Sequence, residues 1–209
     1  GTNLGAFRII HQIGEGGMAK VYKAYQPSME RYVALKVLPG HYATDPQFTE
    51  RFIREARTIA RLEHRHILPV YDFGEQDGTT FLAMRLVEGG TLKELLSKGR
   101  LTLHDTLDLI TQVCSALDYA HRNHVVHRDI KPSNVMLDSE GAVYLTDFGI
   151  AKVLEAAGDL TASGAAIGTP AYMAPEQAVG DKVDGRTDLY ALGVVLYEMV
   201  TGTVPFKGE

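Results

Sequence analysis

The chain has 209 residues, of which 45% are hydrophobic and 22% are charged, and its formal net charge at pH 7 is −5. This profile is typical of a globular protein with one large domain or two lobes. The acidic balance gives no support for a nucleic-acid-binding protein, although a local basic groove would be compatible with it. We find neither an apolar run long enough for a membrane span nor a signal-peptide pattern. We therefore expect a cytoplasmic protein, or the cytoplasmic part of a longer one.

The first part of the chain is predicted to be rich in β-strands. Runs of β-branched and aromatic residues alternate with Gly-rich or Pro-containing turns. From about Asp45 to Glu63, apolar residues recur at helical spacing and predict one helix. The five predicted strands are Phe7–Ile13, Val21–Tyr25, Tyr32–Leu38, Leu68–Phe73 and Thr80–Met84.

The second part is predicted to be mostly helical. Glu88-Gly89-Gly90 indicates a flexible joint, and Thr91 with Glu94 has the spacing of a helix capping box. A short hairpin is expected at 135–145, and the apolar segment Thr187–Thr201 resembles a buried core helix. Leu103–Asn123 predicts an amphipathic helix, whose buried side would carry Leu107, Ile110, Val113, Cys114, Leu117 and Ala120.

Cys114 is the only cysteine, so an intrachain disulfide is excluded. Its place in an apolar helical pattern predicts a buried, inert thiol. The two parts of the chain predict two lobes, and a cleft between lobes is a favoured place for a ligand site.

Three glycines lie between the first two predicted strands, where backbone N–H groups could approach phosphates. A purely structural glycine turn is an equal alternative for this pattern alone. A Walker A loop is excluded because Gly-Lys-Ser/Thr does not follow, and a Rossmann turn because a strand follows. The segment comprises Ile13, Gly14, Glu15, Gly16, Gly17, Met18, Ala19, Lys20 and Val21.

Lys36 stands in the apolar run Val33-Ala34-Leu35-Lys36, although lysine is rarely buried without a partner. The strand could be an edge strand with Lys36 in solvent. The alternative is an anionic partner, and Glu55 on the inward face of the following helix is the candidate.

The segment His127-Arg128-Asp129-Ile130-Lys131-Pro132-Ser133-Asn134 is followed by Asp147-Phe148-Gly149 and later by Ala174-Pro175-Glu176. Together with the glycine-rich segment and Lys36, these motifs resemble the protein kinase family in order and setting, from Phe7 to Phe206. The resemblance implies an α+β, bilobal fold. A small lobe with a five-stranded antiparallel sheet and one helix would span residues 1–87, and a larger, mainly helical lobe would span 88–209.

The resemblance also implies roles for single residues. Asp129 would accept or orient the proton of the attacking hydroxyl, and Lys131 would neutralise charge on the γ-phosphate of ATP. Asn134 and Asp147 would supply oxygen ligands to Mg²⁺, with Mn²⁺ as an alternative ion.

The ATP site implied by the resemblance lies mostly in the first part of the chain. An ion pair between Lys36 and Glu55 would hold the α- and β-phosphates, and the backbone of residues 14–19 would cover them. Ala19 replaces the third glycine of the family's pattern, which we do not interpret as inactivating. The adenine contacts would come from the backbone of Arg85 and Val87, from Met84 as gatekeeper, and from Val21, Ala34 and Met136.

A column of side chains and a substrate loop complete the resemblance. Ile59, Val70, His127 and Phe148 would stack across the lobes, and Asp188 would anchor the column to the catalytic-loop backbone. Between Gly149 and Ala174 we expect a mobile activation loop. Its candidate phosphorylation sites are Thr161 and Ser163, whose phosphates would pair with Arg128. Ordinary loop hydroxyls remain the alternative.

Lys131 and Thr169 match serine/threonine kinases, and several motifs resemble bacterial members of the Hanks type. Kinases of that group are often the cytoplasmic domain of a membrane-anchored protein, and back-to-back dimers of the small lobe occur among them. Protein substrates are expected as partners, rather than nucleic acid. A pseudokinase and a small-molecule phosphotransferase are the alternatives. The catalytic residues argue against the first, and the Ala-Pro-Glu platform argues against the second.

The resemblance ends before the last helices of the family's large lobe. One of these usually supplies an arginine to the glutamate that matches Glu176. We therefore expect a truncated domain in which Glu176 lacks that partner.

Overall fold

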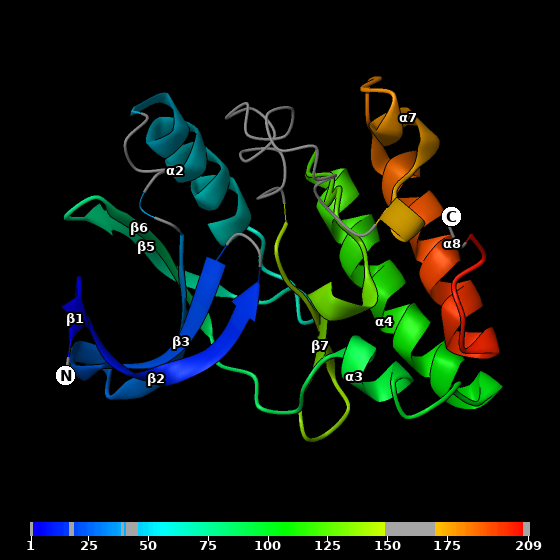
Figure 1. The fold of residues 1–209 in the computed structure, drawn as a ribbon, viewed down its shortest axis with the longest axis horizontal. Helices are drawn as coiled ribbons and strands as arrows, with labels where there is room; N and C mark the ends of the chain where they lie inside the picture. Colours follow the sequence, from blue (N-terminus) through cyan, green and yellow to red (C-terminus); the bar gives the residue numbers. More distant parts are fainter. Residues whose placement is uncertain (1, 17–18, 39, 41–45, 149–169, 207–209) are drawn as a thin grey trace. The chain divides into compact units, whose positions relative to one another are not determined.

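The computed structural model describes residues 2–16, 19–38, 40, 46–148 and 170–206. The chain divides into two compact units. The first consists of residues 1–63 and 68–87, and the second of residues 64–67 and 88–209. Figure 1 shows the fold and labels most of the helices and strands.

The first unit is built on an antiparallel sheet with the strand order β1-β2-β3-β4-β6-β5. Its strands are β1 (Asn3–Leu4), β2 (Phe7–Gly16), β3 (Ala19–Gln26), β4 (Arg31–Val37), β5 (Val70–Gln76) and β6 (Thr79–Arg85). The α+β class is confirmed, but the described sheet has six strands instead of the expected five. The additional strand β1 has only two residues, too few for an alternating pattern to reveal it.

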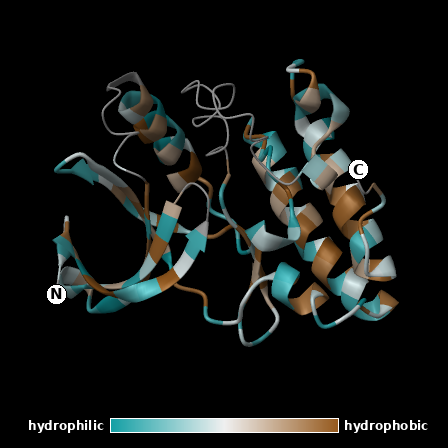
Figure 2. Cartoon of the chain, viewed as in Figure 1, coloured by the Kyte–Doolittle hydropathy of each residue, from teal (hydrophilic) through white to brown (hydrophobic). Residues whose placement is uncertain are grey.

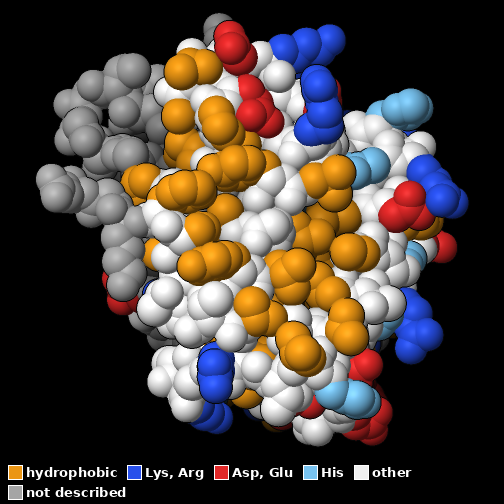
Figure 3. Space-filling view, turned by 90° about the vertical axis from the view of Figure 1, so that its right-hand side faces the viewer, with side chains coloured by type: hydrophobic (Ala, Val, Ile, Leu, Met, Phe, Trp, Pro, Cys, Tyr) orange, Lys and Arg blue, Asp and Glu red, His pale blue; other side chains and the backbone are white. Residues whose placement is uncertain are grey.

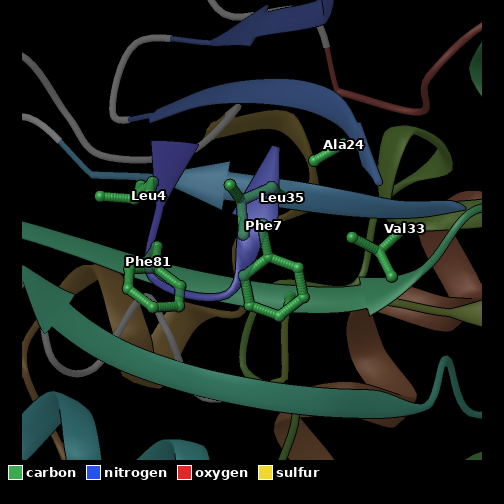
Figure 4. Close-up of a cluster of buried hydrophobic side chains, with 7 residues drawn as sticks. Leu4, Phe7, Ala24, Val33, Leu35 and Phe81 are labelled. Atoms are coloured by element: carbon green, nitrogen blue, oxygen red, sulfur yellow. The ribbon is translucent and has the colours of Figure 1, made fainter. Parts of the chain in front are cut away.

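The two faces of this sheet carry different sets of side chains, because successive residues of a strand point to opposite faces. One face forms an apolar cluster, shown in Figure 4. In it the rings of Phe7 and Phe81 meet edge to face with centroids 6.0 Å apart. The cluster consists of Leu4, Phe7, Ala24, Val33, Leu35, Phe81 and Ala83.

In the first unit, helix α2 (Pro46–Ala60) contacts β5. Phe48, Phe52, Ala56 and Ile59 are buried at the expected helical spacing. A short 3₁₀ turn, η1 (Pro27–Met29), connects β3 to β4. The strands and the helix predicted in this part of the chain are therefore present, with bounds that differ by a few residues.

The second unit contains the helices α3 (Leu92–Leu96), α4 (Leu103–Arg122), α7 (Pro175–Ala178) and α8 (Gly185–Thr201), together with the hairpin of β7 (Val135–Leu137) and β8 (Val143–Leu145). The 3₁₀ turns η2 (Pro132–Asn134) and η3 (Pro170–Tyr172) connect them. The capping box is confirmed, since Thr91 Oγ1 accepts from the Glu94 N–H and the Glu94 carboxylate accepts from the Thr91 N–H.

The predicted buried side of α4 is wrong in part. Leu107 and Cys114 are exposed, and Ile110 is half-buried. The burial that remains around the sulfur still raises the pKa of the Cys114 thiol. The buried stripe is shifted by about one residue from the predicted one. The prediction failed because α4 also carries leucines on its exposed side. The buried residues are Thr106, Leu109, Val113, Ala116, Leu117 and Ala120.

Helix α8 is apolar over most of its length, as Figure 2 shows, but it is only partly buried. Ala191, Val195 and Met199 are buried, whereas Leu189 and Tyr197 are exposed. Hydrophobic side chains gather on the face of the second unit that Figure 3 shows. The expected apolar helix is therefore confirmed, but its burial is confirmed for one side only.

Candidate active site

The segment 127–134, the expected catalytic loop, receives two backbone contacts from a buried carboxylate. Asp188, in the first turn of α8, has no exposed surface. Its Oδ2 accepts from the His127 backbone N–H (2.8 Å), and its Oδ1 accepts from the Arg128 backbone N–H (2.7 Å). A buried carboxylate needs such donors because desolvation of the charge is costly. The start of α8 thus fixes the backbone that leads into Asp129.

His121, in the last turn of α4, donates a further hydrogen bond to Asp188. Its Nε2 lies 2.7 Å from Asp188 Oδ2. Gly185 makes room for this ring, since a Cβ there would meet His121 Nδ1 at 2.9 Å. His121 is not predicted by any sequence motif; its one signal is that it is a polar residue next to the buried Ala120.

Asp129 itself is polarised on one of its two oxygens. Lys131 Nζ donates to Oδ2 at 2.7 Å, and Asn134 Nδ2 donates to the same oxygen at 2.9 Å. The side chain of Asp129 is 26% exposed. Both of these hydrogen-bond donors bind Oδ2, so the two oxygens of the carboxylate are not equivalent.

Asn134 connects Asp129 to Asp147. Its Nδ2 also donates to the Asp129 carbonyl (2.8 Å), and its own carbonyl accepts from the Thr146 N–H (3.0 Å). The next residue, Asp147, has a φ of 66°, in the left-handed region that aspartate tolerates. The Asn134 backbone is thus bonded to Thr146, the residue before Asp147, and a shared metal site of Asn134 and Asp147 stays a prediction.

His127 and Phe148 pack within the second unit, with ring centroids 4.4 Å apart. His127 Nε2 donates to the Thr146 carbonyl (2.9 Å), and Nδ1 accepts from the Asp129 N–H (3.3 Å). Because a carbonyl only accepts and an N–H only donates, these partners assign the Nε2–H tautomer. Ile59 and Val70 belong to the first unit, and their stacking with these rings stays a prediction.

The segment before α8 is also anchored to that helix. Thr187 Oγ1 donates to Glu176 Oε1 (2.6 Å), and this hydrogen bond lowers the pKa of the Glu176 carboxyl. Glu176 is therefore not left unpaired, although its partner in the described chain is a hydroxyl rather than the arginine usual in the family. Tyr172 donates to Glu198 Oε2 (2.6 Å), and its pKa is raised by burial and then by this carboxylate.

In the first unit, several candidate ATP-binding residues share the sheet face opposite the apolar cluster. Strand register pairs Val21 with Lys36 and Ala34 with Met84, and Lys36 lies two residues from Ala34. Paired residues and residues two apart point to one face. Gly14 pairs with Val21 at the end of that face, beside Ile13, Glu15 and Gly16 of β2 and Ala19 of β3.

For the remaining candidate ATP-binding residues, the structure gives the position but does not test the role. The Arg85 backbone N–H donates to the Pro69 carbonyl (3.0 Å), so an adenine contact from Arg85 would have to use its carbonyl. Val87 ends the first unit, and Met136 lies on β7 of the second. Glu55 lies on α2, and its ion pair with Lys36 stays a prediction. Gly17, Met18, Thr161, Ser163 and Thr169 lie outside the described residues.

The described residues contain no cluster of three or more His, Cys, Asp or Glu side chains placed to hold a metal ion. A family metal site with Asn134 and Asp147 as its protein ligands would not form such a cluster. In the same part of the chain, no helix combines the length and apolar character needed to cross a membrane.

Comparison with known proteins identifies the family. Residues 7–209 match the protein kinase domain. Serine/threonine-protein kinase PrkC of Bacillus subtilis is 43% identical over 98% of this chain and 32% of its own length. Serine/threonine-protein kinase PknH of Mycobacterium tuberculosis strain H37Rv is 43% identical over 100% of this chain and 33% of its own. The chain thus spans about a third of these relatives.

A solved structure gives the same result for the fold. The PknI kinase domain of Mycobacterium tuberculosis superposes with a TM-score of 0.82 at 35% identity, over 99% of this chain and 79% of that chain. The family uses ATP and a divalent metal ion, and it acts on protein substrates. The match covers nearly every residue and includes the catalytic loop, so this chain belongs to the protein kinase domain family.

Proposed function

We propose that this chain is the catalytic domain of a serine/threonine protein kinase, which transfers the γ-phosphoryl group of ATP to hydroxyls of protein substrates. The observation that carries the proposal is the arrangement around Asp129. Its Oδ2 receives Lys131 Nζ and Asn134 Nδ2, and its neighbouring peptide N–H groups are fixed by Asp188 and His127. The family resemblance to named serine/threonine kinases supports the acceptor class.

In this proposal Asp129 orients the acceptor hydroxyl and receives its proton. With Oδ2 held by two donors, Oδ1 is the oxygen that can meet the substrate. Little covalent chemistry is required, because the transition state of phosphoryl transfer is loose and positioning dominates. Lys131, 2.7 Å from the carboxylate, is near enough to neutralise charge on the transferred group.

Mg²⁺ is the metal ion we propose, with Mn²⁺ as an alternative, and Asn134 and Asp147 would hold it. The Asn134 amide nitrogen donates to Asp129, so its Oδ1 lies on the other side of the carboxamide. Amide and carboxylate oxygens are the hard ligands that Mg²⁺ prefers. An ion held there would supply electrostatic stabilisation of the charge that develops on the transferred phosphoryl group.

The sheet face that carries Val21, Ala34, Lys36 and Met84 is the proposed nucleotide side of the first unit. Lys36 would pair with Glu55 and the phosphates, and the backbone of residues 14–19 would cover them. The side chain of Ala34 is a single methyl group, so it would leave room for the nucleotide on this face. Arg85 and Val87 would contribute backbone contacts to adenine.

Phosphosite mapping tests the proposal. The chain is incubated with MgATP beside the variant Asp129→Asn, and phosphate is located by mass spectrometry. We expect phosphate on serine or threonine, with Thr161 or Ser163 modified in the wild type. The variant should lose about 10²–10⁴ in rate, the usual contribution of a positioned base. Retained ATP binding without any transfer would favour a pseudokinase, and faster transfer to small alcohols would favour a small-molecule phosphotransferase.

Three wider expectations also stand as proposals. The kinase domain would be the cytoplasmic part of a longer, membrane-anchored protein, and its first unit would form back-to-back dimers. Helices beyond those described would cover the apolar face of α8, for which the exposed Leu189 and Tyr197 provide support. Light scattering tests the dimer. Equal melting of this chain and a C-terminally extended version would contradict the covering helices.

A further inference from the structure

Arg128, next to the candidate catalytic residue, has an unfavourable backbone conformation. Its φ is 70°, in the left-handed region that residues with a β-carbon rarely adopt. Such a conformation is strained and persists only when surrounding contacts hold it. The contacts made by the two peptide groups of Arg128 therefore decide where Asp129 points.

Both peptide groups are held by side chains from distant parts of the second unit. The Arg128 N–H donates to Asp188 Oδ1 at 2.7 Å. The Arg128 carbonyl accepts from Gln177 Nε2 at 2.8 Å, across 49 positions of sequence. Asp188 was expected to anchor this loop, whereas Gln177 has no role in the site described so far.

The orientation of the Gln177 side chain is determined by its two partners. Its Oε1 accepts from the Ala174 backbone N–H at 3.2 Å, while its Nε2 faces the Arg128 carbonyl. A flipped amide would set donor against donor and acceptor against acceptor. Gln177 therefore connects the start of α7 directly to the peptide bond that precedes Asp129.

Asn134 makes the corresponding contact on the other side of Asp129. Its Nδ2 donates to the Asp129 carbonyl at 2.8 Å. The peptide bonds before and after Asp129 are thus each held by a carboxamide, the first by Gln177 and the second by Asn134. Asn134 lies only five positions away, but Gln177 comes from the segment that follows Pro170–Tyr172.

We propose that Gln177 is a positioning residue for Asp129, which couples the Ala174–Gln177 turn to the orientation of the catalytic carboxylate. The proposal rests on the proposed kinase function, because its effect on rate requires phosphoryl transfer. If the turn shifts, the donor leaves the Arg128 carbonyl and the strained residue can relax. Misplacement of a reacting group by about 1 Å can cost about 10² in rate.

The variant Gln177→Glu isolates the contact. A carboxylate keeps an acceptor for the Ala174 N–H, but it has no hydrogen to donate to the Arg128 carbonyl. Gln112→Glu is the matched control, because Gln112 Oε1 only accepts, from the Val143 N–H at 3.0 Å. Both variants add one negative charge and keep their acceptor contact, but only the first removes a hydrogen bond to the catalytic loop.

The measurements are kcat with casein as acceptor, KM for MgATP, the melting temperature, and amide hydrogen exchange of residues 127–130. For Gln177→Glu we expect kcat to fall about ten- to a hundredfold with KM for ATP within about twofold. Exchange at 127–130 should rise. Gln112→Glu should leave all four close to wild type. Gln177→Leu, which removes both contacts without adding charge, should also lower kcat.

The outcomes that overturn the positioning role of Gln177 differ from the outcome that overturns the proposed kinase function. If the wild type transfers phosphate and the two glutamate variants have equal kcat, Gln177 does not position Asp129. The same holds if Gln177→Glu lowers only the melting temperature, as a merely structural residue would. If the wild type transfers no phosphate, the proposed function fails, and unchanged exchange at 127–130 in Gln177→Glu would then overturn the coupling by itself.

Discussion

The interactions inside the first unit differ in kind from those inside the second unit. The first has an apolar cluster on one face of its sheet, with Phe7 and Phe81 at its centre. The second has buried polar groups around its catalytic loop, among them Asp188, His127 and Asn134. Apolar burial is roughly additive in area, whereas a buried polar network depends on every partner being in place.

This difference separates stability from positioning. In the first unit, loss of a buried side chain mainly removes packing energy. In the second, loss of one polar partner leaves another buried group unsatisfied and releases a strained backbone at Arg128. Substitutions in the first unit should therefore change the free energy of unfolding, and substitutions near Asp188 should change activity more than stability.

The largest loss of stability is expected for Phe81→Ala. A Cβ at Gly5 or Gly74 would lie 3.0 or 3.1 Å from Phe81 Cζ, so the ring lies against two residues that have no side chain. Such neighbours cannot fill the cavity, and the first unit should lose about 3–5 kcal/mol. Urea unfolding, followed by hydrogen exchange of β2, β4 and β6 amides, measures the change.

Met29→Ala is the control, because Met29 is 61% exposed in the same unit. It should change the free energy of unfolding by less than about 0.5 kcal/mol. Equal losses for the two variants would show that the cluster does not stabilise the first unit as described.

A smaller loss of stability, with a larger loss of activity, is expected for Asp188→Asn. Asparagine has one acceptor oxygen, so at least one of the His127 and Arg128 N–H groups would face an amide NH₂. One unsatisfied buried donor costs about 1–3 kcal/mol. Melting and kcat of the variant measure both effects. A variant that melts lower but keeps its kcat would break the contrast between the two units.

Much of the first unit was predictable from the sequence, for a physical reason. Strand alternation places Val33 and Leu35 on one face and Ala34 and Lys36 on the other, and the observed register agrees with this pattern. Local spacing sets such a pattern. β1 was missed because two residues have no detectable alternation.

The second unit was less predictable where its contacts join residues that are far apart in the sequence. The motifs located Asp129, Asn134 and Asp147, but His121 contacts Asp188 across 67 positions and Gln177 contacts Arg128 across 49. No local pattern encodes such contacts. Exposure of Leu107 and Cys114 was also missed, because periodicity on α4 is interrupted by leucines on both sides.

The smallest effect is a pH dependence of the second unit that depends on His64. Its Nδ1 accepts from the His66 N–H (3.2 Å), its Nε2 lies 3.2 Å from Ser115 Oγ, and its ring stacks on Tyr119. Burial, and then the nearby His66 and Arg65, lower the pKa of His64 below its usual 6.5. These contacts suit the neutral ring, with Nε2–H as the donor.

The folded state therefore binds the His64 proton less tightly than the unfolded state does. Since stability rises with pH wherever the unfolded state binds more protons, the free energy of unfolding should fall as pH drops below about 6.5. His64→Gln keeps a donor and an acceptor but does not titrate, so its stability should change less between pH 7 and 5. Hydrogen exchange of β4, in the first unit, should be the same in both proteins. Equal slopes for wild type and variant in the second unit would contradict the role of His64, because the burial that lowers its pKa would then have no energetic consequence.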